Sequence, residues 1–196
     1  MEIRQRIISS CRELAHSKGF RSITVDEIAQ HAGVSKRTVY RRFKTKDEIL
    51  SATVDDFLQD IGRESEQLLN SGQDIRIIIQ DILYYIISGK KSIINQRVME
   101  DLAQYYPQLW QKINQFRMDR IRSMIAIAES QHAFNSEINP LILSTMILVS
   151  IQTVINPDFI IKNNLNFEEA AAQVIAVFMP ALSSAPPLPD IKAKPC

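Results

Sequence analysis

The spacing of apolar residues is the feature that most constrains how this sequence can fold. In the first segment, apolar side chains recur at intervals of three or four residues, at Ile3, Ile7, Cys11, Leu14 and Ala15. Residues 75–87 repeat this spacing with isoleucine and leucine. An interval of about 3.6 residues places side chains on one face of an α-helix, whereas a half-buried strand needs an alternation of period two. The sequence therefore predicts an all-α fold.

Capping residues mark where the expected helices begin and end. Two segments have the S/T-x-x-E sequence of a capping box: Thr24 with Glu27, and Thr45 with Glu48. Gly33 fits the position after a helix end, and Ser35 fits the N-cap of the next helix. Pro107 and Pro140 fit first helical positions, and Asn166 fits a further N-cap. We expect about nine helices, at about residues 2–18, 25–32, 36–42, 46–70, 74–88, 92–104, 107–131, 139–155 and 167–182.

The charges are distributed unevenly, although their sum is only +1. Residues 1–50 carry 11 basic and 6 acidic residues, and residues 51–196 carry 12 basic and 16 acidic residues. A basic segment beside a neutral or acidic body is typical of a protein that holds a phosphate backbone with one part of its surface.

Cysteine usage and targeting signals exclude several classes of protein. The two cysteines cannot form a disulfide framework and lack metal-ligand spacing with the three histidines, so we expect no metal and no cofactor. No signal peptide is recognised, and a reducing, cytoplasmic location is expected. The longest apolar stretch, residues 141–155, has about 15 residues against the roughly 20 that span a bilayer, so we expect no membrane partner. The proline-rich residues 183–196 are expected to be disordered.

Residues 24–43 contain two expected short helices joined by a tight turn at Gly33, which is typical of a helix-turn-helix. If Val39 faces the core, Arg37 and Arg41 face the opposite side, at 100° per residue. Guanidinium groups on such a face suit the major groove, where they bind guanine O6 and N7 or phosphate oxygens. A merely solvated face is the alternative, but six cations lie between residues 36 and 46, where their mutual repulsion brings no benefit to folding.

The same segment resembles the DNA-binding domain of TetR-family transcriptional regulators. Residues 20–50 read FRSITVDEIAQHAGVSKRTVYRRFKTKDEIL, and members of the family share the pattern G-F-x-x-T-T-x-x-I-A-x-x-A-G-V-S-x-x-T-L-Y-x-x-F-x-x-K-x-x-L. The resemblance is strong over residues 3–60. The sequence departs from it at Ile23, where Thr is common, at Val39, where Leu is common, and at Arg37, where Gly or Pro is frequent. The long Arg37 side chain means that the family's usual base preferences do not carry over.

The resemblance implies specific contacts with DNA. Thr24, Tyr40 and Lys46 match positions that contact phosphate, and Arg42 matches a position that touches the DNA backbone. The recognition helix implied by the match contributes Ser35, Lys36, Arg37, Thr38 and Arg41. For Tyr40, a place at the edge of the core is the alternative to phosphate binding.

The resemblance also implies how the chain is divided. A DNA-binding domain is expected at residues 1–46, a connecting helix at 46–70, and an effector-binding and dimerisation domain at 71–182. The implied function is a homodimeric repressor that binds a pseudo-palindromic double-stranded DNA operator and is released by an apolar or amphipathic small molecule. A DNA-binding regulator without a small-molecule ligand is the first alternative. An all-α enzyme is a remote one, because His16, His31 and His132 lack catalytic partners in the sequence.

The last two expected helices have more apolar surface than one core contact needs. Residues 141–155 are apolar on more than one face, so one face is expected to pack inside and the other against a second copy. Expected dimer contacts are Met146, Val149, Val174 and Phe178. A fully internal core is the alternative.

Aromatic and flexible apolar residues on the middle helices are candidates for an effector pocket. The candidates are Tyr84, Met99, Leu102, Tyr106, Trp110, Ile113 and Phe116. At helical spacing each of them also fits an ordinary core position. Arg117, Arg120 and Arg122 are expected to face solvent, and a contact with an acidic ligand is the alternative. No charged group stands alone in an apolar stretch to mark an effector's carboxylate or amine.

Overall fold

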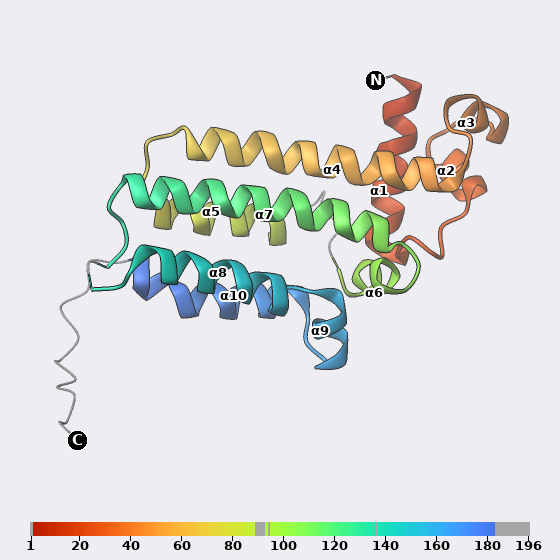
Figure 1. Ribbon diagram of the computed structural model, residues 1–196. Coiled ribbons are helices and arrows are strands. Elements are labelled where there is room, and N and C mark those ends of the chain that lie inside the picture. Colours follow the sequence, from red (N-terminus) through yellow and green to blue (C-terminus); the bar gives the residue numbers. More distant parts are fainter. Residues whose placement is uncertain (1, 89–92, 94, 136, 183–196) are drawn as a thin grey trace.

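The computed structural model describes residues 2–88, 93, 95–135 and 137–182, and its regular elements are helices throughout this part of the chain (Figure 1). In chain order they are α1 (Ile3–Lys18), α2 (Val25–His31), α3 (Lys36–Arg42), α4 (Lys46–Leu69), α5 (Ile75–Ser88), α6 (Gln96–Gln104), α7 (Pro107–Ser130), α8 (Pro140–Val154), α9 (Pro157–Lys162) and α10 (Phe167–Phe178), followed by the 3-10 turn η1 (Met179–Leu182). The predicted all-α fold is confirmed. The tail predicted to be disordered lies outside the described residues.

The described helices number one more than expected from the sequence. The additional helix is α9, which begins at Pro157 behind Asn156, whose side chain accepts the Asp158 N–H at 2.9 Å. This Asn-Pro start is the same signal that marks α8, so it was readable in the sequence. The last predicted helix also ends early, because the chain tightens into η1 after Phe178.

The two predicted capping boxes differ in the structure. The Thr24 hydroxyl accepts the Glu27 N–H at 3.2 Å, and the Glu27 carboxylate accepts the Thr24 N–H at 2.9 Å, so this box is complete. The Thr45 hydroxyl accepts the Glu48 N–H at 3.2 Å, but the Glu48 carboxylate accepts the Lys44 N–H instead. The second box is therefore only half formed, and its carboxylate satisfies the residue before the N-cap.

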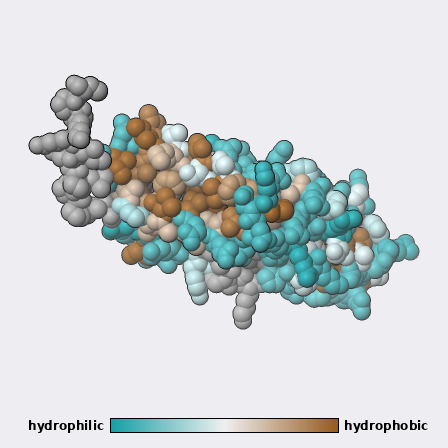
Figure 2. Space-filling model, turned by 90° about the horizontal axis from the view of Figure 1, so that it is seen from below, coloured by the Kyte–Doolittle hydropathy of each residue, from teal (hydrophilic) through white to brown (hydrophobic). Residues whose placement is uncertain are grey.

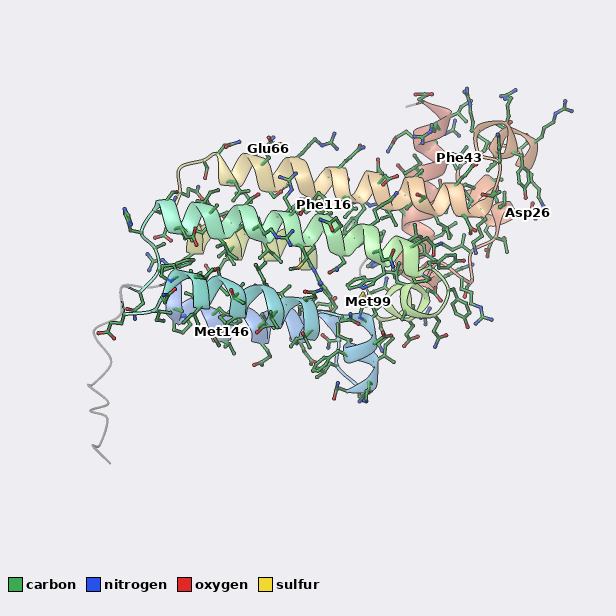
Figure 3. The ribbon with its side chains drawn as sticks, in the orientation of Figure 1. Asp26, Phe43, Glu66, Met99, Phe116 and Met146 are labelled. Atoms are coloured by element: carbon green, nitrogen blue, oxygen red, sulfur yellow. The ribbon has the colours of Figure 1, made fainter. Side chains whose placement is uncertain are left out.

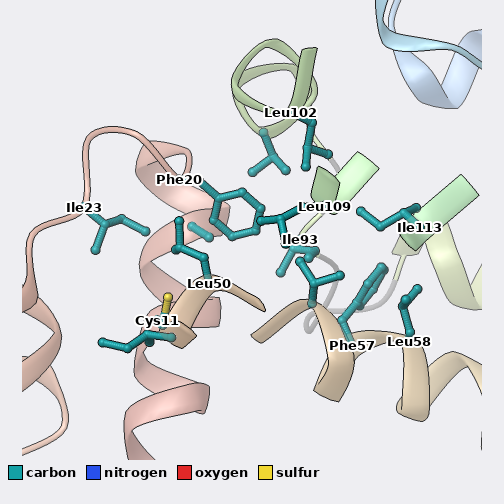
Figure 4. Close-up of a cluster of buried hydrophobic side chains, with 14 of the residues drawn as sticks. Cys11, Phe20, Ile23, Leu50, Phe57, Leu58, Ile93, Leu102, Leu109 and Ile113 are labelled. Carbon is teal, nitrogen blue, oxygen red and sulfur yellow. The ribbon is translucent and has the colours of Figure 1, made fainter. Parts of the chain in front are cut away.

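One apolar core continues from the N-terminal helices into the second half of the molecule. Phe20 is fully buried and lies among Leu50, Leu102 and Leu109, which come from α4, α6 and α7 (Figure 4). Its ring meets that of Tyr106 edge to face, with centroids 6.2 Å apart. Burying a side chain of this size contributes roughly 1.5–3 kcal/mol. The N-terminal helices are thus anchored on α6 and α7 as well as on α4.

A largely buried ion pair joins α1 to α4. Arg12 donates to the carboxylates of Asp56, at 3.0 Å, and Asp60, at 2.6 Å. The Arg12 guanidinium also lies 5.2 Å from the centroid of the Phe57 ring. Burial alone would raise the pKa of Asp60, but its hydrogen bonds to Arg12 and to Arg63 outweigh that effect and hold the pKa below its usual range.

Beyond α4, the long helices α5, α7, α8 and α10 run side by side and form the body of the molecule (Figure 1). The helix-turn-helix, α2 and α3, lies at one end of this body, away from α8 and α10. None of the helices in the described ranges is long and apolar enough to cross a membrane.

Candidate DNA interface, cavity and association surface

The turn between α2 and α3 is fixed by one glycine and one arginine. Gly33 has a φ of +61°, in the left-handed region that glycine adopts without steric cost. The Val34 N–H returns to the Ala29 carbonyl at 2.9 Å. From α1, the Arg6 guanidinium donates to the carbonyl groups of Ala32 and Gly33, which lie directly after the last residue of α2. The angle between the two short helices is therefore held by a third element.

Helix α3 presents a basic face to solvent. Ser35 caps it by accepting the Thr38 N–H at 3.1 Å, and Val39 is fully buried against the rest of the domain. On the other side, Arg37, Arg41 and Arg42 are exposed, and the structure records no hydrogen bond or ion pair for their guanidinium groups among the residues it describes. These side chains are free to meet an external anion.

Four other predicted DNA contacts are already engaged within the protein. The Lys36 ammonium pairs with Asp26 at 2.8 Å, a hydrogen bond that raises the pKa of this exposed lysine. The hydroxyls of Ser35 and Thr38 lie 2.9 Å apart, and that of Thr24 belongs to the capping box. These groups would reach phosphate only by sharing or exchanging their present partners.

Lys46 and Tyr40 occupy different environments. The Lys46 ammonium donates to the Arg21 carbonyl at 2.9 Å, and partial burial lowers its pKa. Tyr40 is 47% exposed beside the basic face, so its hydroxyl is accessible. Lys46 therefore also holds the loop before α2 in place.

Helix α6 clamps the junction between α1 and α2. The Asp101 carboxylate accepts the Arg21 N–H at 2.9 Å, and Arg97 donates to the Ser17 carbonyl at 2.7 Å. Gly19 has a φ of +78°, and a Cβ there would lie 2.5 Å from an Asp101 oxygen. The Arg21 guanidinium covers the Tyr105 ring, with 4.2 Å from Cζ to the centroid. A movement of α6 would therefore be transmitted directly to the loop that begins the helix-turn-helix.

A cavity of about 230 Å³ lies among α4, α5, α7, α8 and α10. Three predicted pocket residues, Trp110, Ile113 and Phe116, line it. Phe116 points from α7 toward α4 in Figure 3. The remaining candidates, Tyr84, Met99, Leu102 and Tyr106, do not line this cavity.

The prediction of Tyr84, Met99, Leu102 and Tyr106 as pocket residues is wrong. Tyr84 is 73% exposed, because the apolar stripe of α5 faces the other way. Met99 and Leu102 are buried in the core that α6 shares with the N-terminal helices, and Leu102 lies near Phe20 (Figure 4). Tyr106 packs on Phe20. Met99, Leu102 and Tyr106 therefore occupy ordinary core positions, which was the alternative considered for them.

The expectation that Arg117 faces solvent is also wrong. Arg117 lines the cavity, where its guanidinium lies 5.2 Å from the centroid of the Trp110 ring. Its place on α7 is four residues after Ile113 and four before Ile121, both of which line the same cavity. That spacing is the signal that sequence reasoning missed, since Arg117 occupies a position on the apolar stripe.

The outer faces of α8 and α10 carry exposed apolar side chains. We call the set formed by Leu141, Ile142, Met146 and Val149 of α8 and Val177 of α10 the association surface. Met146 and Val149 are 54% and 56% exposed. Seen from below, apolar residues gather on the left half of this face of the molecule (Figure 2).

Two predicted dimer contacts lie on the wrong face for that role. Val174 is only 9% exposed, and both Val174 and Phe178 line the cavity. The face of α10 that reaches solvent is instead the one with Val177. The error arose because α10 is apolar on two sides, so periodicity alone did not separate the inner from the outer face.

These features define a helix-turn-helix protein with an exposed basic recognition helix and an all-helical body. Residues 7–53 match the family described as bacterial regulatory proteins, tetR family. This match, together with relatives named as HTH-type transcriptional regulators, supports a DNA-binding transcriptional regulator of the TetR family. This points to a regulator rather than to the all-α enzyme considered from the sequence.

Relatives of the chain align over nearly its whole length. The transcriptional regulator YvaF of Bacillus subtilis is 22% identical over 184 residues, which cover 92% of this chain and 95% of YvaF. The reduced form of Escherichia coli NemR has a TM-score of 0.66 at 13% identity, covering 92% of this chain and 97% of NemR. SmeT, the repressor of the Stenotrophomonas maltophilia multidrug efflux pump SmeDEF, has a TM-score of 0.63 at 17% identity, covering 95% and 97%. SmeT is also known as a complex with triclosan.

Proposed function

We propose that this regulator is a cytoplasmic homodimeric repressor, which binds a pseudo-palindromic DNA operator and is released by an apolar or amphipathic small molecule. The observation that carries the DNA-binding part is the exposed face of α3, where Arg37, Arg41 and Arg42 have no recorded partner within the described protein. Guanidinium groups form bidentate hydrogen bonds with guanine edges and with phosphate oxygens. The helix is short and rigidly held, so it meets the major groove with a defined set of side chains.

Two lines of reasoning support a dimer. One recognition helix of two turns makes few base contacts, whereas a twofold pair binds two half-sites with the same surface. The association surface on α8 and α10 is exposed and apolar, as expected of a face that a second copy covers.

The cavity supports release by a small molecule. An apolar space of about 230 Å³ within the helical body is a place for a ligand, whereas a regulator without a ligand has no need of it. Helix α7 lines the cavity and also packs against α6. Helix α6 in turn holds the loop before α2 through Asp101 and Arg97. A ligand with higher affinity for one arrangement of α6 and α7 would shift the spacing of the two recognition helices.

Selection of bound DNA from a random duplex pool tests the proposal. We expect the selected sequences to contain an inverted repeat whose half-site centres lie about one helical turn, or a multiple of it, apart. A single half-site would contradict the dimer, and no enrichment at all would contradict the DNA-binding role. If the protein binds the selected operator with the same affinity in the presence and absence of every small molecule tested, the regulator without a small-molecule effector would be favoured.

Substitutions on α3 should separate base recognition from phosphate binding. Arg37→Ala and Arg41→Ala are each expected to weaken operator binding by about 1–3 kcal/mol and to relax the preference at particular base pairs. Tyr40→Phe and Lys46→Ala are expected to weaken binding to operator and to random DNA alike, because they remove phosphate contacts. Binding curves on the selected operator and on single-base variants measure both effects. An equal loss on specific and random DNA for all four variants would show that the base-contacting residues are wrongly assigned.

A further inference from the structure

Arg117 is a cation without a carboxylate partner beside an apolar cavity. No ion pair is recorded for it within the described residues, and the other polar side chains that line the cavity are Ser65 and Arg120. The Ser65 hydroxyl is satisfied by the Gly62 carbonyl at 3.0 Å. The charge of Arg117 is therefore not compensated by an opposite charge in this lining.

The hydrogen bonds of Arg117 leave part of the guanidinium unused. Nη1 donates to the Ile155 carbonyl at 2.6 Å, and Nη2 donates to the Asn114 side-chain oxygen at 2.6 Å. Nε is buried and has no hydrogen-bond partner. A guanidinium has five N–H donors, and a buried donor without an acceptor is destabilising.

The environment of Arg117 favours an anion. Desolvation by burial lowers the pKa of its guanidinium to about 10, so the group still carries its charge at neutral pH. A charge held in an apolar region is stabilised most by an opposite charge that also accepts its hydrogen bonds. A carboxylate is planar and presents two oxygens, which matches the edge formed by Nε and one Nη.

The cavity limits the size of the remainder of the ligand. An apolar protein cavity of about 150 Å³ holds benzene, so a cavity of about 230 Å³ holds a molecule of about nine non-hydrogen atoms. We propose that the cavity binds an apolar carboxylate of this size, with its head group on Arg117 and its tail among Phe116, Ile113 and Ile147. The inference rests on the proposed ligand-responsive function and names the chemical class of the effector.

The position of Arg117 also connects the ligand to α8. Ile155 is the C-cap of α8, and its carbonyl is one of the groups that Arg117 holds. A carboxylate is a stronger acceptor for a guanidinium than a neutral carbonyl. Binding of the anion thus competes with the contact that ties α7 to the end of α8, the helix that carries most of the association surface.

Three molecules with one tail and different head groups test the proposal: octanoate, 1-octanol and octylamine. Calorimetric titration of the full chain is expected to show octanoate binding about tenfold or more tighter than octanol, and octylamine binding weaker than octanol, because only the carboxylate pairs with the cation. Arg117→Met should remove the preference for octanoate while keeping octanol binding. The matched control is Arg120→Met, which changes another arginine of the same lining and should retain the preference.

Equal affinity for octanoate and octanol in the unsubstituted protein would overturn the proposal, as would a preference that survives in Arg117→Met. The comparison of head groups on the unsubstituted protein and on Arg120→Met decides the matter even if Arg117→Met does not fold. Failure of this proposal is distinguishable from failure of the proposed function. If the selected operator is bound but octanoate is not preferred, only the anion site is rejected; if octanoate is bound through Arg117 but no duplex is, only the DNA-binding role is rejected.

Discussion

Val149→Glu is expected to convert the protein into a folded monomer and to weaken operator binding by on the order of 100-fold or more. Val149 is 56% exposed in the single chain, so the substitution leaves the core of one subunit intact. In a dimer formed through the association surface, the glutamate would bury an unpaired charge. Each monomer would then bind its half-site alone. Sedimentation equilibrium and operator titration measure the two effects, and circular dichroism checks the fold.

Ala126→Glu provides the matched control, because Ala126 is an exposed helical position on α7 outside the association surface. This variant should remain dimeric and bind the operator normally. Val177→Glu, on the exposed face of α10, should behave like Val149→Glu. Dimers that persist in both variants would mean that the subunits associate through another surface.

Arg12→Met is expected to lower the free energy of unfolding by about 3 kcal/mol at pH 7. The substitution keeps most of the side-chain volume but leaves Asp56 and Asp60 largely buried without their shared cation. Urea denaturation measures the change. The control is Arg63→Met, because Arg63 pairs with the same Asp60 from the surface and should contribute no more than about 1 kcal/mol. Equal losses for the two variants would contradict the special role of the buried arginine.

The stability difference between Arg12→Met and the unsubstituted protein should shrink in acid. In the unsubstituted protein the pKa of Asp60 lies below its usual range, so the stabilisation is complete above the unfolded value of about 4 and is lost as the pH falls through the folded value. In the variant Asp60 keeps only its pair with Arg63, so burial favours the neutral acid more strongly and protonation costs less stability. Denaturation between pH 3 and pH 7 tests this sign. A difference that stays constant over this range would contradict it.

The sequence predicted the DNA-binding end well because its signals are local. Gly33, Ser35 and the Thr24 capping box each act within a few residues, and the structure has all three as predicted. The inward position of Val39 follows from the helical period alone. Turn and cap chemistry is set by the backbone of the segment itself, so it can be recognised without knowledge of the fold.

The cavity and the association surface were predicted less well because they depend on which helices meet. Val174 lies on an apolar helix face that another helix covers. The neighbouring residues in the sequence do not indicate which apolar face is covered. Arg117 was assigned to solvent by its charge, although its spacing from Ile113 and Ile121 placed it on the buried stripe of α7. Lys46 likewise matches a phosphate-binding position, but its contact with the Arg21 carbonyl arises from the approach of two distant segments. Where residue type and spacing disagreed, spacing gave the correct side of the helix.

The salt dependence of operator binding tests most directly whether two copies of the basic helix α3 hold one duplex. If each subunit neutralises roughly three to four phosphates, the logarithm of the association constant should fall with the logarithm of the salt concentration with a slope on the order of −5 to −7. The same duplex with one half-site scrambled should give weaker binding with a smaller slope. A slope near zero, or equal affinity for the intact and the scrambled duplex, would contradict the account.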